Sequence, residues 1–353
     1  MELKTIGLTK KFGSKTAVDN LNITLTNGVY GLLGANGAGK TTLMRLLCNI
    51  QNPTSGKILL NGKNIVGLGE RYRNLLGYLP QHFGYYPDFS AFDFLLYVSA
   101  LKGLDEKAAR KKSKELLEAV DLSRESKHKI KTFSGGMKQR LGIAQAMLND
   151  PHILILDEPT NHLDLRATEW LEEYLGKFKG TVLTVSHDRY FLDQVVDRII
   201  EIQEGRAEFY QGSYSFYAVE KERRYQERMK QYEKEQAKIA QLEKAAEQLR
   251  VWAFMGMDKT YRRAISMEKR IERMRTTSKP TKARKMDARF SSAEFHGDEV
   301  LGIRSLSKSF GEKKLFEGIS LKVEGGERIA LIGDNGTGKP TLIKMIVGEL
   351  YPD

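Results

Sequence analysis

The sequence has few of the features that mark secreted, disulfide-rich or membrane-spanning chains. It contains one cysteine, Cys48, so no internal disulfide can form, and a reducing compartment suits it. It has no run of about 18 apolar residues, the length needed to cross a bilayer, and its first ten residues lack the apolar core of a signal peptide. We therefore expect a cytoplasmic protein that neither spans a membrane nor enters the secretory path.

The composition is that of a globular protein with an uneven distribution of charge. Of the 353 residues, 41% are hydrophobic and 29% are charged, which excludes a wholly disordered chain and allows two or three domains. The net charge is +12, and residues 211–297 supply nine of these charges, with 21 Lys and Arg against 12 Asp and Glu. Such a concentration favours a polyanionic partner.

The chain repeats itself, which predicts two copies of one domain. The second copy stops at Pro352 and Asp353, so it lacks roughly the last three quarters of the first. We expect a first domain at 1–210, a helical linker at 211–297 and an N-terminal fragment of a second domain at 298–353. The repeated positions are Leu8, Lys10, Phe12, Gly13, Gly34, Asn36, Gly37, Gly39 and Lys40, which recur as Leu306, Lys308, Phe310, Gly311, Gly333, Asn335, Gly336, Gly338 and Lys339.

Hydrophobic patterning predicts an α/β first domain. The apolar run 29–33 predicts a strand, and the spacing of apolar residues in 41–50 predicts a helix. The aliphatic runs 153–156 and 181–185 are typical of strands buried on both faces of a parallel sheet. Residues 92–120 predict a helical insert.

The glycine-rich run GANGAGKT, from Gly34 to Thr41, is a complete P-loop between the predicted strand and helix. Its glycines allow backbone N–H groups to surround phosphates at a helix N-terminus. Lys40 would reach the β- and γ-phosphates, and the Thr41 hydroxyl would ligate Mg²⁺. A glycine-rich turn that binds nothing is the alternative, and the strand–loop–helix context argues against it.

A second motif is HILILDE, in which the predicted buried strand ends at two acidic residues, Asp157 and Glu158. A carboxylate at the end of a strand beside a P-loop can hold Mg²⁺, so Asp157 is the candidate for that role. A second carboxylate there can polarise the attacking water, which makes Glu158 the candidate general base.

The segment FSGGMKQR, from Phe133 to Arg140, resembles the signature motif of ABC-type ATPases, and the resemblance covers residues 1–210. It implies a P-loop NTPase that uses ATP and Mg²⁺, with Gln81 in the Q-loop, Asn161–Asp164 as the D-loop and His187 as the switch histidine. The implied catalytic residues are Glu158, His187 and Gln81, and the implied metal-binding residues are Thr41, Gln81 and Asp157. The implied nucleotide-binding residues are Phe12, Gly34, Asn36, Gly37, Gly39, Lys40, Thr41 and Thr42, and the implied signature residues are Ser134, Gly135 and Gly136.

The resemblance further implies two domains that face each other head to tail, each ATP lying between one P-loop and the opposite signature. Within this chain the second P-loop would face Ser134–Gly136, and a homodimer through residues 1–210 would give two sites. The second P-loop has Pro340 where Ser or Thr is expected, so it lacks the metal-binding hydroxyl and one backbone N–H. We expect weak or Mg²⁺-insensitive nucleotide binding there, through Gly333, Asn335, Gly336, Gly338, Lys339 and Thr341.

The basic linker reads as a helical hairpin. Apolar residues recur at three- and four-residue steps from Tyr225 to Leu249 and again from Tyr261 to Met274, with a reversal at 252–257. Residues 259–289 hold 12 basic and three acidic residues, which suits RNA phosphates, while a solvated spacer is the plainer alternative. The candidate RNA contacts are Trp252, Lys259, Arg262, Arg263, Lys269, Arg270 and Arg273.

The hairpin between two ATPase domains, with YQGSY at 210–214 and MEKRIERM at 267–274, resembles the linker of ABC-F proteins. This family works on ribosomes without a membrane domain. The resemblance implies that ATP-driven closure moves the linker against rRNA and tRNA, in translation regulation or in antibiotic protection of the ribosome. Residues 1–150 also resemble the ATPase subunit of an ABC transporter, whose partner would be a separate membrane permease. A regulatory protein that binds ATP without hydrolysing it is a third interpretation.

Overall fold

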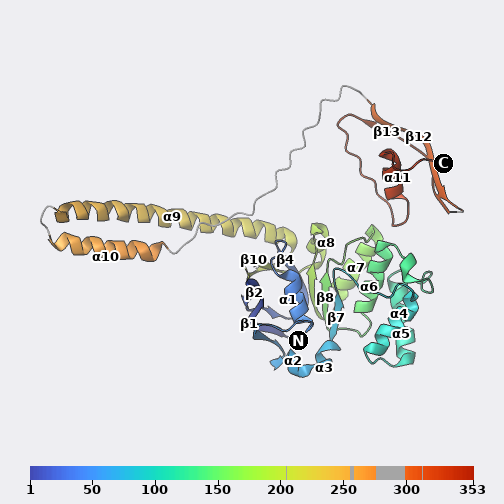
Figure 1. The fold of residues 1–353 in the computed structure, drawn as a ribbon, viewed down its shortest axis with the longest axis horizontal. Coiled ribbons are helices and arrows are strands. Elements are labelled where there is room, and N and C mark those ends of the chain that lie inside the picture. Colours follow the sequence, from blue (N-terminus) through green and yellow to red (C-terminus); the bar gives the residue numbers. More distant parts are fainter. Residues whose placement is uncertain (204, 255–257, 276–298, 312) are drawn as a thin grey trace. The chain divides into compact units, whose positions relative to one another are not determined.

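The computed structural model describes all residues except 204, 255–257, 276–298 and 312, and it leaves the side chains of 252–254, 258–261, 299 and 313 undescribed. The described chain falls into two compact units, one of Met1–Tyr214 with Ser292–Asp353, and one of Ser215–Ser291. The helices and strands of the two units are labelled in Figure 1.

Two sheets form the first domain, and their strands alternate with helices in an α/β order. A mainly antiparallel sheet has the order β2-β1-β5-β6, with β3 paired to β1, and a second sheet has the order β11-β10-β4-β9-β8-β7. The elements are β1 (Leu3–Phe12), β2 (Lys15–Leu21), β3 (Thr24–Leu25), β4 (Gly28–Gly34), α1 (Lys40–Leu47), β5 (Ser55–Leu60), β6 (Lys63–Asn64), α2 (Ile65–Leu68), α3 (Glu70–Arg73), β7 (Leu76–Leu79), α4 (Ala91–Leu101), α5 (Glu106–Ala119), a 3₁₀ turn (Ile130–Thr132), α6 (Gly135–Ala146), β8 (Ile153–Asp157), α7 (Leu165–Lys177), β9 (Thr181–Val185), α8 (Arg189–Val195), β10 (Arg198–Gln203) and β11 (Arg206–Gln211).

The second sheet is parallel except for its edge strand β11. Every residue of β8 and β9 is buried, which the sequence predicted from the unbroken aliphatic run of β8 and the mostly aliphatic run of β9. Because β4, β9, β8 and β7 run in the same direction, their carboxyl ends meet at one edge of the sheet. The loops that follow these strands are therefore neighbours, although they come from distant parts of the sequence.

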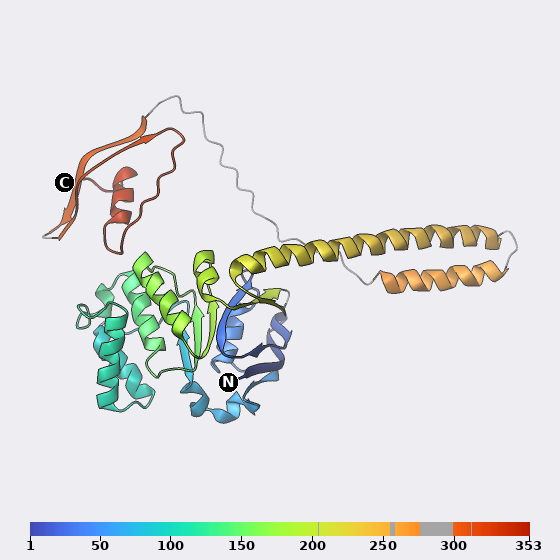
Figure 2. The ribbon, with the colours of Figure 1, turned by 180° about the vertical axis from the view of Figure 1, so that it is seen from behind.

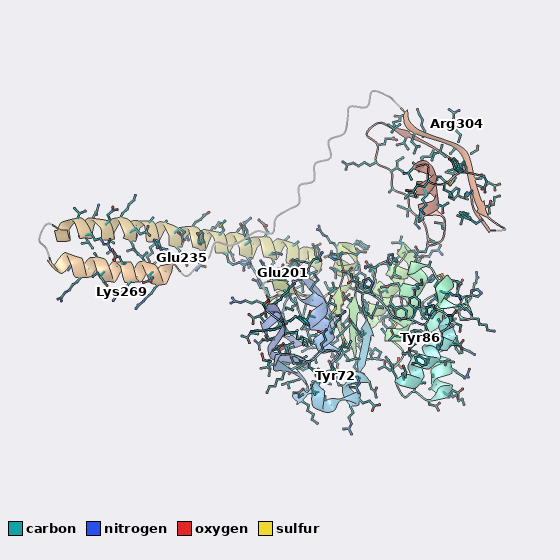
Figure 3. All side chains as sticks on the ribbon, in the orientation of Figure 1. Tyr72, Tyr86, Glu201, Glu235, Lys269 and Arg304 are labelled. Atoms are coloured by element: carbon teal, nitrogen blue, oxygen red, sulfur yellow. The ribbon has the colours of Figure 1, made fainter. Side chains whose placement is uncertain are left out.

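Helix α1 joins the two sheets into one hydrophobic core. Its Leu43, Met44, Leu46 and Leu47 are fully buried, and they belong to the same buried cluster as apolar residues of both sheets. Tyr72, labelled in Figure 3, is also fully buried, and its hydroxyl donates a hydrogen bond to the carbonyl of Leu47. This burial fixes the helix that begins at the P-loop.

Helices α4 and α5 form the helical insert that was predicted at 92–120, and α6 follows them in the chain. Each begins at a capping side chain that accepts backbone N–H groups of its first turn: Ser90 for α4, Asp105 for α5 and Ser134 for α6. The Ser134 cap therefore sets the N-terminus of the signature helix.

The second copy consists of β12 (Glu299–Phe310), β13 (Lys313–Glu324) and α11 (Lys339–Ile346). Its residues 328–332 correspond to the apolar part of β4 but form no strand, and Ile329, Leu331 and Ile332 are exposed. In the first copy β4 is held between β9 and β10. The described residues of the second copy contain no counterpart of these two strands, which explains the difference.

The second unit is a helical hairpin of α9 (Tyr214–Phe254) and α10 (Asp258–Met274). The two helices lie side by side in both views (Figures 1 and 2). Ile239 and Ala246 of α9 and Ala264 and Ile271 of α10 are buried, as the predicted apolar seam requires. Two ion pairs also cross between the helices, Arg250–Glu268 at 2.7 Å and Arg275–Glu243 at 2.6 Å. Within the described residues, no helix combines the length and the apolar composition that a bilayer crossing needs.

Candidate functional site

A cavity of about 500 Å³ opens at the carboxyl edge of the parallel sheet. It collects side chains that follow four strands: the P-loop after β4, Gln81 after β7, Asp157 and Glu158 at β8, and His187 after β9. The lining residues are Phe12, Lys15, Ala17, Asn36, Gly37, Gly39, Lys40, Thr41, Thr42, Gln81, Asp157, Glu158, Val185 and His187.

The P-loop backbone depends on glycine at Gly34 and Gly39. Both residues have positive φ angles, 152° and 97°, in a range that residues with a Cβ rarely adopt. A Cβ at Gly39 would also collide with the carbonyl oxygen of Ala17, and one at Gly34 would collide with that of Ile202. The loop thus packs directly on the backbones of two neighbouring segments. Gly34 does not line the cavity itself, but its carbonyl accepts a hydrogen bond from Lys40.

Lys40 provides a positive charge within the P-loop at the cavity. Its Nζ donates hydrogen bonds to the carbonyls of Gly34, at 2.7 Å, and Ala35, at 3.1 Å. Burial lowers the pKa of the Lys40 amine, while the nearby carboxylates of Glu158 and Asp157 act in the opposite direction. A negatively charged ligand in the cavity would stabilise the protonated amine, which is how a P-loop lysine holds phosphate.

Asp157 and Thr41 provide oxygen ligands of the kind that Mg²⁺ prefers. Thr41 Oγ1 lies 3.3 Å from Asp157 Oδ2, and Gln81 lines the same cavity. Burial raises the pKa of Asp157, and the Thr41 hydroxyl and the Lys40 charge partly offset this. The described residues hold no cluster of three or more His, Cys, Asp and Glu suited to a metal ion. Mg²⁺ is usually bound through one or two carboxylates, waters and substrate phosphates, and Asp157 is a carboxylate of this kind.

Glu158 is buried and its carboxylate is held from the side of β9. The backbone N–H of His187 donates to Glu158 Oε2 at 3.1 Å, and His187 Nε2 lies 3.3 Å from Glu158 Oε1. The imidazole itself is 76% exposed, so it is open to a ligand in the cavity. The structure thus brings two of the three predicted catalytic residues, Glu158 and His187, into direct contact.

The predicted signature residues Ser134, Gly135 and Gly136 do not line this cavity. They form the N-terminus of α6, where a Cβ at Gly136 would meet the carbonyl of His162 in the predicted D-loop. The second P-loop contacts the same segment: Asn335 Nδ2 donates to the carbonyl of His162 at 2.8 Å, and Asn335 N donates to Asp164 Oδ2 at 3.3 Å. The expected pairing of the second P-loop with the signature stays a prediction.

The second P-loop repeats the backbone of the first. Gly336 and Gly338 have φ angles of 89° and 90°, and Lys339 bonds to the carbonyls of Gly333 and Asp334 as Lys40 does to its own loop. Pro340 is in the first turn of α11, where α1 has Thr41. Thr341 is one residue further on, so the loop retains its shape without a hydroxyl at the metal-binding position.

The candidate RNA-contact residues of the hairpin lie mainly on the outer face of α10. Arg262, Arg263, Lys269, Arg270 and Arg273 are exposed, and the 3.6-residue period puts them on the side away from buried Ala264 and Ile271. Lys269 is labelled in Figure 3. Trp252 and Lys259 are on α9 and α10, but their side chains lie outside the described residues, as does the tip at 255–257.

Sequence reasoning missed several residues at or behind the cavity. Lys15, Ala17 and Val185 line it, although no motif marks them. Lys15 and Ala17 follow Phe12 closely at the start of β2, so their proximity to that aromatic ring was the available signal. Gln139, within the signature run, reaches the backbone of Glu158, and the sequence alone assigned it no role.

We predict that Gly39→Ala lowers the affinity for ATP by at least about 10-fold, because both the φ angle and the contact with Ala17 oppose a Cβ. Gly37→Ala is the control, since Gly37 also has a positive φ but no atom within 4 Å of an added Cβ. Calorimetric titration with ATP would measure both variants. Equal losses would show that the close approach to Ala17 does not matter.

We also predict that Asp157→Asn stabilises the nucleotide-free protein while it weakens Mg²⁺-dependent ATP binding. Burial raises the pKa of Asp157, so its charged form costs stability above that pKa, and Asn removes the charge without changing the shape. The melting temperature should rise by about 1–2 °C near pH 8. As the pH falls through the raised pKa, the wild-type carboxyl gains its proton and the difference should shrink. A gain of equal size at every pH would contradict this explanation.

Comparisons with known proteins place this geometry in a family. A family model described as ABC transporter matches residues 18–161 and 316–353, and a second ABC transporter model, for the extension, matches residues 200–290. The solved ATP-binding subunit of an ABC transporter aligns at 25% identity with a TM-score of 0.56, covering 60% of this chain and 90% of that one. The post-hydrolysis dimer of the cassette MJ0796, bound to ADP and Pi, aligns at 26% identity with a TM-score of 0.54, covering 59% and 98%.

Curated relatives match along nearly the whole chain. The ATP-binding protein YdiF of Bacillus subtilis is 33% identical over 100% of this chain and 59% of its own length. ABC transporter F family member 2 of Arabidopsis thaliana is 32% identical over 91% of this chain and 52% of its own. The energy-dependent translational throttle protein EttA of Escherichia coli K12 is 30% identical over 95% of this chain and 64% of its own.

The chain therefore spans between about half and two thirds of the length of these relatives. The linker match and the ABC-F relatives extend the likeness beyond the ATPase domain that all ABC proteins share. With its ABC ATPase domain, its extension hairpin and its partial second ABC segment, the chain belongs to the ABC-F family of ATP-binding proteins.

Proposed function

We propose that this protein binds and hydrolyses ATP with Mg²⁺, and that the resulting domain closure moves the basic hairpin against ribosomal RNA and tRNA. The observation that carries the proposal is the single cavity in which Lys40, Asp157, Glu158 and His187 converge. A relative named as a translational throttle supports translation as the process.

The chemistry assigned to the chain's own residues follows from their positions. Lys40 and the P-loop N–H groups would bind the phosphates, and Phe12, which is 49% exposed at the cavity, would stack on the base. Thr41, Asp157 and Gln81 would hold Mg²⁺, which neutralises phosphate charge when bound. Glu158 would accept a proton from the attacking water. The His187 side chain would contact the γ-phosphate, while the backbone N–H of His187 holds the Glu158 carboxylate.

The charge pattern of the hairpin supports contact with RNA. On α9, Arg223 pairs with Glu220 and Glu227, and Arg224 pairs with Glu220. These two cations are therefore partly neutralised within the helix. Among the described residues of the hairpin, no salt bridge involves Arg262, Arg263, Lys269 or Arg270 of α10. A row of exposed, unneutralised cations on one helix face suits binding to a phosphate backbone. A solvated spacer does not require such a row.

A second candidate function is that of an ATP-binding subunit with a separate membrane permease. One surface favours it: the exposed rings of Tyr86 and Tyr97 pack edge to face at 5.4 Å between the loop after Gln81 and α4. Exposed aromatic clusters commonly mark docking sites. The linker hairpin is unexplained by this function.

Replacing Glu158 by Gln should lower ATP hydrolysis about 10²-fold or more, because the amide cannot accept a proton from water. ATP affinity should be unchanged, since the phosphate-binding groups remain. Glu201→Gln is the matched control, because Glu201 is a buried glutamate outside the cavity. Unchanged turnover in Glu158→Gln would remove Glu158 from the mechanism.

The same Glu158→Gln variant tests the partner. With ATP it should remain in the closed state and sediment with ribosomes. Without ATP a smaller fraction of the protein should sediment with them. Sedimentation with membranes alone would favour the permease-coupled function instead.

The hairpin assignment predicts that changing Arg262, Arg263, Lys269, Arg270 and Arg273 together to Gln weakens binding to ribosomal RNA. The slope of the logarithm of the binding constant against the logarithm of the salt concentration should also become shallower. The change should be roughly 0.7–0.9 for each phosphate that the variant no longer neutralises. The control changes five exposed cations of α9 to Gln: Arg228, Lys230, Lys234, Lys238 and Lys244. An equal weakening in both variants would show that total charge, and not the outer face of α10, determines binding.

A further inference from the structure

Gln139 connects the signature helix to the backbone of the proposed general base. It lies on α6, one turn after the signature residues, and its side chain is only 8% exposed. Its Nε2 donates two hydrogen bonds, to the carbonyl of Glu158 at 3.0 Å and to that of Pro159 at 3.1 Å. Both acceptors are in the segment that leaves β8, so one amide holds two consecutive peptide groups.

The backbone that Gln139 holds is in an unfavourable conformation. Glu158 has a φ angle of 55°, in the left-handed region that side chains other than Gly, Asn and Asp seldom adopt. Such a conformation persists only where surrounding contacts impose it. Here the N–H of Glu158 donates to the carbonyl of Val185 at 2.9 Å, and its own carbonyl accepts from Asn161 N at 3.3 Å as well as from Gln139.

This conformation directs the Glu158 side chain to β9. The carboxylate accepts the backbone N–H of His187, so the backbone of Glu158 and its reactive oxygens are fixed by different elements. Because φ at Glu158 determines where the side chain points, releasing the carbonyl would let the carboxylate move. A displacement of about 1 Å at a catalytic group can reduce turnover on the order of 10²-fold.

Helix α6 also contacts the following loop at its N-terminus. The ring of His162 lies against Gly135, and its carbonyl lies against Gly136. The signature helix therefore touches the 158–162 segment at two points one turn apart, through its signature glycines and through Gln139. A rigid helix in contact at both points transmits a shift of its N-terminus to the Glu158 carbonyl.

We propose that Gln139 is a positioning residue that couples the signature helix to Glu158, so that the base is oriented for proton transfer only while α6 is seated against the 158–162 segment. Gln139 itself touches no reacting atom. The inference rests on the proposed hydrolysis of ATP with Glu158 as base, and it adds the link by which the signature helix controls that base.

The test replaces Gln139 with Met, which has a similar length and volume but no donor. We expect kcat to fall about 10- to 100-fold while ATP affinity stays within about twofold of wild type.

In the Glu158→Gln background, Gln139→Met should cause no further decrease in single-turnover hydrolysis, because the base whose position Gln139 sets is already absent. The control is Gln145→Met on the same helix. Gln145 is half-buried, and within the described part of the chain its side chain makes no hydrogen bond.

A second measurement does not depend on turnover. Amide hydrogen exchange of Glu158 and Asn161 should accelerate in Gln139→Met and should be unchanged in Gln145→Met. Wild-type turnover in Gln139→Met would overturn the inference, and so would an equal additional decrease in the Glu158→Gln background. If the wild-type protein hydrolyses no ATP, the proposed function fails, and unchanged exchange at residues 158–161 would then separately overturn the positioning role.

Discussion

Parallel pairing of four strands is the constraint on which the site depends. Because β4, β9, β8 and β7 are hydrogen-bonded neighbours that run in the same direction, their carboxyl ends present the P-loop, His187, Asp157 and Gln81 at one edge. Helix α1 is buried against both sheets, so the loop that precedes it has little freedom. The phosphate-binding groups are therefore held in place by the hydrophobic core as well as by contacts within the loop, such as those of Lys40 with the carbonyls of Gly34 and Ala35.

That arrangement costs stability at the cavity. Burial lowers the pKa of Lys40 and raises that of Asp157, so each charge is less favourable here than in water, and each is partly offset by the other. Glu158 adds a left-handed backbone that three neighbouring groups maintain, the carbonyl of Val185, the amide of Gln139 and the N–H of Asn161. Catalytic sites typically contain partly buried charged groups and residues with a strained backbone.

The hairpin uses charge in two different ways. Ion pairs such as Arg250–Glu268 and Arg275–Glu243 join the helices to each other, whereas the exposed cations of α10 between residues 262 and 270 enter no ion pair among the described residues. The first set replaces part of the hydrophobic contact that a narrow seam of Ile239, Ala246, Ala264 and Ile271 cannot supply. The second set leaves a positive surface whose range is limited by salt screening, so it acts only on a polyanion that approaches closely.

The sequence by itself determined the features that depend on local patterns. The P-loop is a contiguous motif, β8 is an unbroken apolar run, and the hairpin seam repeats at helical spacing, and these sufficed for the fold class. The signature and linker motifs carried the resemblance to the family. Tertiary structure alone decided that Lys15 and Val185 line the cavity, that Glu158 is left-handed and that Gln139 holds it. It also decided that residues 328–332 form no strand despite an apolar sequence, because a parallel strand needs neighbours that only distant residues provide. Periodicity records which face of an element is apolar, but a contact between elements depends on how they pack, and no single segment encodes that.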